Sequence, residues 1–425
     1  MTGARRRARR AAGALHRALG LAAGALFALL GLTGAVLVFY LEAGEALEPA
    51  IRASAPAAAP PSADALLARL REAFPERTGP WRLEMPLAER SPVRARYYRP
   101  AERADRMFAP LLVTLDPASL AVTSRRFWGD EPLTWLYDLH YSLALDRDGR
   151  TLVGVAGLAM LASLGLGAWI AWPSRARGVR AWLPAPRAGP VRRTYDVHAL
   201  AGLYGAAVLA LLAATGAALA LPGPVHALLG TAGAHGPAAH GAHSAAAQGA
   251  NGAAAHGAHG PTAHGARDHG PAARAAREHG PARPEAPEAG AAASLDDAIR
   301  TARRRFPGAE VRWIESSGAD GEPVSVRLHQ AFEPSRRFPR TQVWIDAASG
   351  AVVAVNDPRH ASAADTLLAW LHPLHNGEAF GIAGRIVACA AGVLPALLAV
   401  TGWMRWRHKA RARRAASARH AARPD

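Results

Sequence analysis

The chain has 425 residues, is half apolar, carries a net charge of +17 and contains one cysteine. A single cysteine excludes disulfide frameworks, cysteine-ligated zinc, iron–sulfur clusters and covalently attached c-type haem. Any redox cofactor must therefore be held by other side chains, and the 18 histidines are the obvious supply.

Four apolar runs indicate an α-helical integral membrane protein, because each is close to the ~20 residues that a helix needs to cross a bilayer. We expect transmembrane helices over residues 19–41, 151–172, 197–221 and 382–404, with Arg385 the one charge among them. The first run is too long for a signal-peptide core, so it predicts an uncleaved anchor. A soluble four-helix bundle is the alternative, but uncharged runs of this length favour a membrane.

Basic residues gather in the segments 1–18, 173–196 and 405–425, which together account for the whole excess of positive charge. By the positive-inside rule these segments lie in the cytoplasm, and so do both termini. The basic residues would then contact anionic lipid of the bilayer, and no pattern typical of nucleic-acid binding is present. The remaining segments are expected outside, in the periplasm.

The expected periplasmic part contains two small α+β units, at 42–134 and 293–358. Each unit begins with an amphipathic helix, at 63–74 and 295–306, and continues with strands of alternating polarity. The strands that the pattern predicts are 111–115, 121–124, 324–328, 343–345 and 352–353. Interface segments at 135–150 and 359–381 lead back to the membrane.

The segment 222–292 is rich in Ala, Gly, Pro and His and has almost no large apolar residues. It cannot bury a core, so we expect a disordered periplasmic linker. Its histidines suit loose binding of Cu, Ni, Zn or Co. The alternative is compositional drift, since no rigid scaffold fixes a coordination geometry. The candidate ligands in this linker are His235, His240, His243, His256, His259 and His264.

The order of residues indicates a duplication of the chain. The aligned residues are His16 with His198, Thr33-Gly34 with Thr215-Gly216, Trp135 with Trp370, and His140 with His375. Both halves start and end inside, so we expect two parallel repeats related by a pseudo-twofold axis along the membrane normal.

Four of the repeated residues are histidines at the expected ends of the helices. His16 and His198 lie at the inner boundary, while His140 and His375 lie at the outer one, about 30 Å away across the bilayer core. Each boundary therefore holds a pair with one histidine from each half. Two facing imidazoles are what b-type haem needs, so we expect two haems and an electron path across the membrane. Ordinary interfacial histidines are the alternative.

Other residues accompany these pairs. His372 would support a ligand, face the substrate or serve as an alternative ligand, and Arg385 would either hold a haem propionate or reach the interface. Glycines that leave room for a macrocycle, or that pack helices closely, are Gly20, Gly24, Gly202 and Gly205. No flavin or nicotinamide motif is present, so electrons would come from a quinol or a redox partner protein.

Several motifs resemble the PepSY-associated transmembrane helix family, also called PiuB-like iron-regulated membrane proteins. The motifs are residues 15–20 together with 31–34, residues 135–143, and residues 371–377 together with 401–402. Residues 343–355 resemble part of a PepSY domain. The resemblance implies a siderophore reductase of the bacterial inner membrane, with His16, His198, His140 and His375 as haem ligands and a ferric siderophore or other metal chelate as substrate. The alternative is a non-catalytic membrane protein whose PepSY-like domains bind or inhibit a periplasmic partner protein.

Overall fold

The computed structural model describes residues 3–55, 60–172, 183, 185, 189–231, 294–318 and 321–421. Among these residues, four long helices each contain a stretch that is long and apolar enough to cross a membrane. They are α1 (Gly3–Leu37), α5 (Asp146–Ala171), α6 (Pro190–Ala220) and α11 (Gly381–Ala421). α1 packs on α5 and α11, and α6 packs on the same two helices, so the four close into a bundle.

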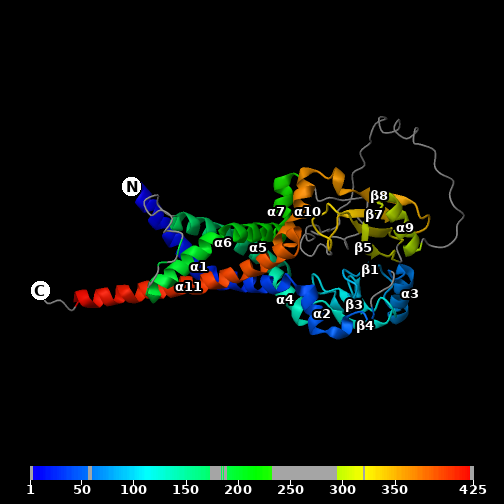
Figure 1. Ribbon diagram of the computed structural model, residues 1–425, viewed down its shortest axis with the longest axis horizontal. Helices are drawn as coiled ribbons and strands as arrows, with labels where there is room; N and C mark the ends of the chain where they lie inside the picture. Colours follow the sequence, from blue (N-terminus) through cyan, green and yellow to red (C-terminus); the bar gives the residue numbers. More distant parts are fainter. Residues whose placement is uncertain are drawn as a thin grey trace, which may run out of the picture.

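The helices run further than the expected spans. α1 includes most of the basic segment 1–18 and ends at Leu37, and α11 continues through the basic tail to Ala421. Alanine and arginine are strong helix formers, so the helices need not end where the apolar stretch ends. Both termini lie at the end of the bundle remote from the sheet, which we call the far end (Figure 1).

Short helices surround the opposite end of the bundle, which we call the sheet end. They are α2 (Tyr40–Leu47), α4 (Pro132–Ser142), α7 (Pro222–Leu229) and α10 (Ala363–His375). α4 packs on α1 and α5, and α10 packs on α6. The expectation of a disordered linker from 222 onward is wrong at its start, because α7 occupies those residues and ends at Gly230 in the left-handed region. The candidate linker histidines lie outside the described residues.

The rest of the chain forms one antiparallel sheet in the order β4-β3-β2-β1-β5-β6-β7-β8. The strands of the first half are β1 (Trp81–Glu84), β2 (Val93–Tyr97), β3 (Leu111–Leu115) and β4 (Val122–Phe127). Those of the second half are β5 (Glu310–Glu315), β6 (Val324–His329), β7 (Thr341–Ile345) and β8 (Val352–Asn356). Each half is a helix followed by four strands paired in sequence order.

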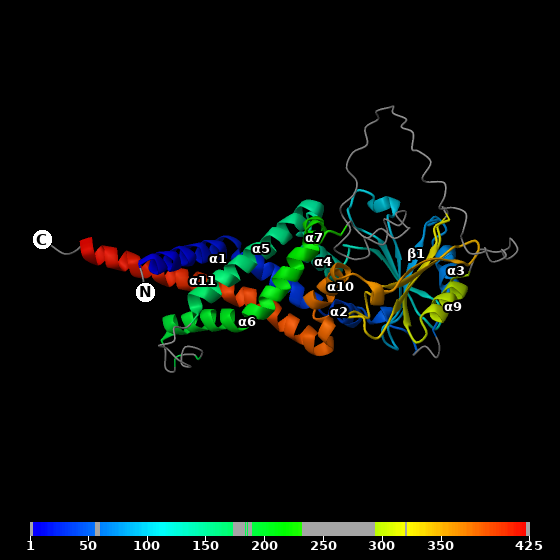
Figure 2. The ribbon, with the colours of Figure 1, turned by 90° about the horizontal axis from the view of Figure 1, so that it is seen from above.

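The sequence indicates two separate α+β units, but in the structure the two halves form one sheet domain. β1 pairs with β5, which places Arg82 opposite Glu315 and Leu83 opposite Ile314 and makes the sheet continuous. α3 (Ala63–Ala73) and α9 (Leu295–Arg305) cover the face of this sheet that points away from the bundle (Figure 2). A single apolar core lies beneath them and contains buried side chains from both halves.

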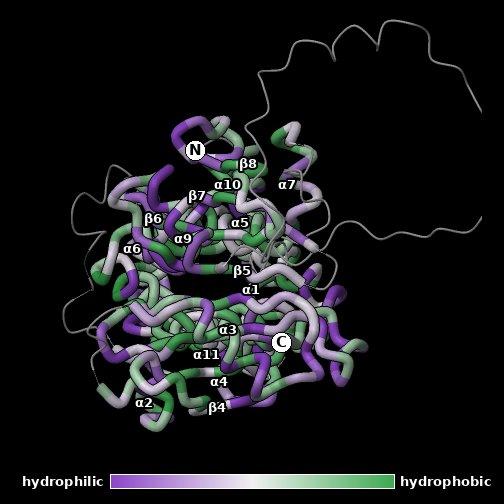
Figure 3. The backbone as a smooth tube through the Cα atoms, turned by 90° about the vertical axis from the view of Figure 1, so that its right-hand side faces the viewer, coloured by the Kyte–Doolittle hydropathy of each residue, from purple (hydrophilic) through white to green (hydrophobic). Residues whose placement is uncertain are grey.

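The two covering helices also cap each other. The carboxylate of Asp64 accepts hydrogen bonds from the backbone N–H groups of Leu295 and Asp296, at 2.8 and 3.1 Å. In return, the carboxylate of Asp296 accepts from the backbone N–H of Ala63 at 2.9 Å and from the hydroxyl of Ser62. Carboxylates at helix N-termini satisfy free N–H groups and favour the helix dipole. Viewed from the sheet end, the second half of the sheet domain lies above the first, with α9 over α3 (Figure 3).

The opposite face of the sheet is polar and looks toward the bundle. Side chains alternate along a strand, so the residues between the core positions gather on this face. Two ion pairs bind neighbouring strands there: Arg82 with Glu315 at 2.8 Å and Arg96 with Glu84 at 2.6 Å. The polar face therefore looks toward the sheet end of the bundle, where the chain enters α5 and α11.

Candidate functional site

The structure brings the four repeated histidines together as two pairs. His16 from α1 and His198 from α6 form the far pair, with ring centroids 6.2 Å apart and ring planes at 69°. His140 from the last turn of α4 and His375 from the end of α10 form the near pair, with centroids 6.1 Å apart and planes at 42°. Each pair thus takes one histidine from each half of the chain.

The Nδ1 atom of every paired histidine is hydrogen-bonded to a neighbouring long helix. The contacts are His16 to Ser163 O at 2.9 Å, His140 to Thr33 Oγ1 at 3.0 Å, His198 to Thr401 Oγ1 at 3.0 Å, and His375 to Leu212 O at 3.0 Å and Thr215 Oγ1 at 3.1 Å. Each threonine hydroxyl donates to the carbonyl four residues earlier, so its oxygen is left to accept from Nδ1–H. These bonds fix the tautomer in which Nδ1 carries the proton and Nε2 keeps its lone pair.

A glycine lies against each ring. A Cβ atom built at Gly34 would lie 2.8 Å from Cε1 of His140, and one at Gly216 would lie 2.8 Å from Cε1 of His375. For the far pair, the same measurement gives 3.0 Å from Gly167 to His16 and 3.2 Å from Gly402 to His198. Any larger residue at these positions would force the imidazole to shift.

The supporting role of these residues was missed in the sequence, although their signal was visible. Thr33-Gly34, Thr215-Gly216 and Thr401-Gly402 served there as markers of the duplication or of the family resemblance. In the structure, each dipeptide supplies the hydroxyl that binds Nδ1 and the glycine that admits the ring. The fourth support departs from this dipeptide, since Ser163 and Gly167 are four residues apart, one turn along α5.

The near pair is held in its neutral form. Burial lowers the pKa of His140 to about 4, assisted by the charge of His375 and opposed by the carbonyl of Leu30. Burial also lowers the pKa of His375, against a raising contribution from the carbonyl of Leu212. Neutral imidazole is the form that binds metals, so both rings are ready to act as ligands at neutral pH.

The donor set fits a metal that brings its own equatorial ligands. Two imidazoles that bind one metal at about 2 Å each have ring centroids roughly 6 Å apart, which both pairs match. Within the described ranges, no group of three or more His, Cys, Asp or Glu side chains gathers to hold a metal. Two imidazoles are the ligands that a b-type haem would need from the chain.

The two other residues expected near the outer site, His372 and Arg385, have different surroundings. His372 lies one turn before His375, and its ring packs edge-on against Phe338 with centroids 4.6 Å apart. Burial, with the charge of Arg337, lowers the pKa of His372 to about 3. Arg385 is bound to Glu42 at 2.7 Å and lies over the ring of Phe39. The charge of Arg385 is thus already neutralised by Glu42.

The four glycines that follow His16 and His198 differ in their surroundings. A Cβ at Gly20 would meet nothing within 4 Å, and those at Gly24 and Gly202 would make ordinary contacts at 3.5 Å. A Cβ at Gly205 would lie 2.5 Å from Cδ1 of Leu394, so this glycine packs helices closely. Gly20 is exposed on the surface of α1, so the empty surroundings of its added Cβ lie outside the bundle.

Comparison with known families supports the resemblance seen in the motifs. Residues 14–409 match the family described as the PepSY-associated TM region, PepSY_TM. The chain belongs to this family. The match runs from α1 into α11 and contains all four paired histidines, so the predicted family is confirmed, and the chain is a PepSY_TM membrane protein. No curated protein matches the chain.

Proposed function

We propose that this PepSY_TM protein carries electrons across the bacterial inner membrane through two bound b-type haems and reduces a ferric siderophore or another metal chelate in the periplasm. The observation that carries the proposal is the presence of two histidine pairs, one at each end of the bundle. In both pairs Nδ1 is hydrogen-bonded to the helices and the ring centroids are about 6 Å apart. One pair alone could serve many purposes, but two pairs at opposite ends suit transfer across the membrane.

The distribution of charge supports the orientation. Both termini, the C-terminal end of α5 and the N-terminal end of α6 lie at the far end (Figures 1 and 2), and in the sequence the basic segments adjoin these ends. The positive-inside rule then assigns the far end to the cytoplasm and the sheet domain to the periplasm. The far pair would accept electrons from a quinol or a redox partner protein, and the near pair would deliver them.

The residues of the chain have separate tasks in this scheme. The four imidazoles would hold the haem iron, while the threonines and Ser163 fix each ring by its Nδ1–H. Haem, when bound, supplies a one-electron carrier that needs no proton transfer at the iron. The apolar helices keep water from the path between the pairs. An electron that reaches a ferric chelate weakens its hold on the metal, because hard oxygen chelators prefer Fe(III) to Fe(II).

A duplication of the chain is part of the proposal. The two halves share the order helix, four strands, short helix with a terminal histidine, and long helix. Their sheets join side by side at β1 and β5, and their capping carboxylates exchange partners. This arrangement is what a pseudo-twofold axis along the membrane normal would produce.

The proposal is tested in proteoliposomes that contain the purified protein, with a reduced quinol analogue as donor and a ferric chelate outside. Fe(II) released from the chelate is followed with a colorimetric Fe(II) trap. We expect reduction that depends on the protein and is lost in His140→Ala. Absence of reduction from protein that binds no haem would instead favour the alternative function, a membrane protein that binds a periplasmic partner.

A further inference from the structure

Arg337 lies in the loop between β6 and β7, and its guanidinium stacks on two aromatic rings at the sheet end of the bundle. It lies over the ring of Tyr40 at 4.3 Å and over that of Phe338 at 4.8 Å, and it donates a hydrogen bond to the hydroxyl of Tyr40. Phe338 in turn packs against His372, one turn before His375. Arg337 is thus connected to the near pair through only two aromatic rings.

The positive charge of Arg337 is not balanced by the acids around it. Burial acts to raise the pKa values of Glu42 and Glu84, but Arg385 lowers that of Glu42 and Arg96 that of Glu84. The charge of Arg337 adds to this lowering in both acids. Each of these acids is already bound to another arginine, Glu42 to Arg385 at 2.7 Å and Glu84 to Arg96 at 2.6 Å. A third carboxylate, that of Glu378, accepts from the backbone N–H of Arg337 and not from its side chain, and within the described residues the guanidinium of Arg337 makes no ion pair. The half-buried guanidinium is therefore left without a carboxylate partner, and such a group favours the binding of an anion.

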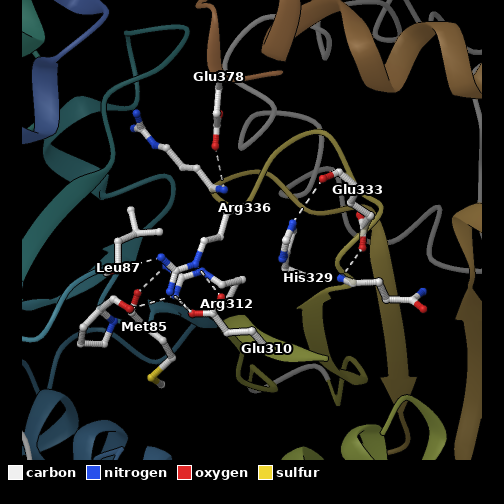
Figure 4. Close-up of polar contacts among 11 residues, drawn as sticks. Met85, Leu87, Glu310, Arg312, His329, Glu333, Arg336 and Glu378 are labelled. Carbon is white, nitrogen blue, oxygen red and sulfur yellow. Dashed lines mark hydrogen bonds and ion pairs between the residues drawn. The ribbon is translucent and has the colours of Figure 1, made fainter. Parts of the chain in front are cut away.

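The loop that carries Arg337 is held from three sides. Arg336 binds Glu310 at 2.6 Å and the carbonyl of Leu87 at 3.1 Å, which ties the loop to both halves of the sheet domain (Figure 4). On the bundle side, Glu378 accepts from the hydroxyl of Ser335 at 2.9 Å and from the backbone N–H of Arg337 at 3.2 Å. The guanidinium is thus positioned before any ligand arrives, which reduces the entropy lost on binding.

We propose that Arg337 is an anion receptor that binds a carboxylate at the sheet side of the near pair. The inference rests on the proposed function, because that function places two sources of carboxylate here: a propionate of the haem and a carboxylate of an anionic ferric chelate. Planar, bidentate pairing with carboxylates is the strength of arginine. Arg385, considered for this role from the sequence, already binds a carboxylate of the chain itself.

The first arm of the test measures the midpoint potential of the near haem in wild type, Arg337→Gln and Arg337→Lys. The control is Arg300→Gln, which removes an exposed arginine of α9 far from the site. Each protein is studied with native haem and with haem dimethyl ester, which lacks propionate charges. If Arg337 binds a propionate, Arg337→Gln lowers the potential with native haem but not with the ester, and Arg337→Lys keeps most of the wild-type value.

The second arm measures binding of gallium citrate, a redox-inert anionic chelate, and of a neutral gallium trihydroxamate by calorimetry. If Arg337 binds the substrate, Arg337→Gln weakens citrate binding about tenfold and leaves the neutral chelate unchanged. Unchanged potentials together with unchanged citrate binding would overturn the inference, even if the protein holds two haems. Protein without haem would refute the proposed function, and the calorimetry would still decide the role of Arg337 toward the chelate.

Discussion

Replacing Gly34 with alanine should weaken haem binding at the near pair while leaving the fold intact. The added methyl would lie 2.8 Å from Cε1 of His140, whereas ordinary contacts begin at 3.4 Å. The ring must therefore retreat by about 0.6 Å, more than the ~0.5 Å within which a designed metal site must hold its ligands. Its Nδ1–H would at the same time move away from Thr33, which lies on the same helix as the new methyl.

The expected loss is about 10- to 100-fold in haem affinity at the near pair, the range found when groups that orient metal ligands are removed. The helix itself gains from the change, since alanine is favoured over glycine by about 1 kcal/mol in a helix interior. A loss of haem would then reflect displacement of the imidazole rather than unfolding. Gly216→Ala should act in the same way, because its methyl would lie equally close to His375.

Gly20→Ala is the matched control, since its methyl would meet nothing within 4 Å. Haem content by pyridine haemochrome and the rate of haem transfer to excess apomyoglobin measure the affinity in each variant. Gly34→Ala and Gly216→Ala should each lose one haem, and Gly20→Ala should keep both. If Gly34→Ala releases haem no faster than Gly20→Ala, the close contact has no part in ligation and the reasoning is refuted.

Three further predictions concern the pairing, the caps and the linker. His16→Ala and His198→Ala should remove the same haem, and His140→Ala and His375→Ala the other. Pyridine haemochrome and spectra of the four variants measure this, and loss of different haems from the two members of a pair would contradict it. Asp64→Ala should lower the free energy of unfolding of the sheet domain by about 1 kcal/mol. Burial acts to raise the pKa of Asp64, but the backbone N–H groups of Asp296 and Leu295 outweigh it and lower the pKa. The stabilisation is therefore present above about pH 4 and lost at lower pH. The free energies of unfolding of wild type and variant in denaturant should converge at low pH, and a difference that stays constant with pH would refute the reasoning. Deleting residues 232–290 should leave haem content and chelate reduction nearly unchanged and affect only tolerance of excess divalent metal, and loss of haem on deletion would show that the linker belongs to the site.

The helix bundle could be predicted because its signal is local. Long uncharged runs identify the four helices, and the basic segments lie at one end of all of them. The chain order of the helix ends then determines which histidines share a boundary, and the structure brings together the same residues. That these pairs bind haem stays a prediction.

The sheet domain could be predicted only in part, because its decisive contacts join distant residues. β1 and β5 are separated by more than two hundred positions, and no local pattern states that Leu83 lies opposite Ile314. β1, β2 and β5 were missed because arginines interrupt their apolar residues, and Arg82, Arg96 and Arg312 are buried through pairing with glutamates. No sequence pattern points to Arg337. Its charge matters because the nearby carboxylates of Glu42 and Glu84 are paired with other arginines, which only the structure shows.

The haem content of the purified wild-type protein tests the central claim most directly. Protein made in haem-replete cells and purified in detergent should contain two b-type haems per chain by pyridine haemochrome. Its reduced spectrum should show the sharp α-bands of low-spin iron with two histidine ligands. A colourless preparation with full helical content by circular dichroism would contradict the account, because both histidine pairs would then be present and empty of the group they are proposed to hold.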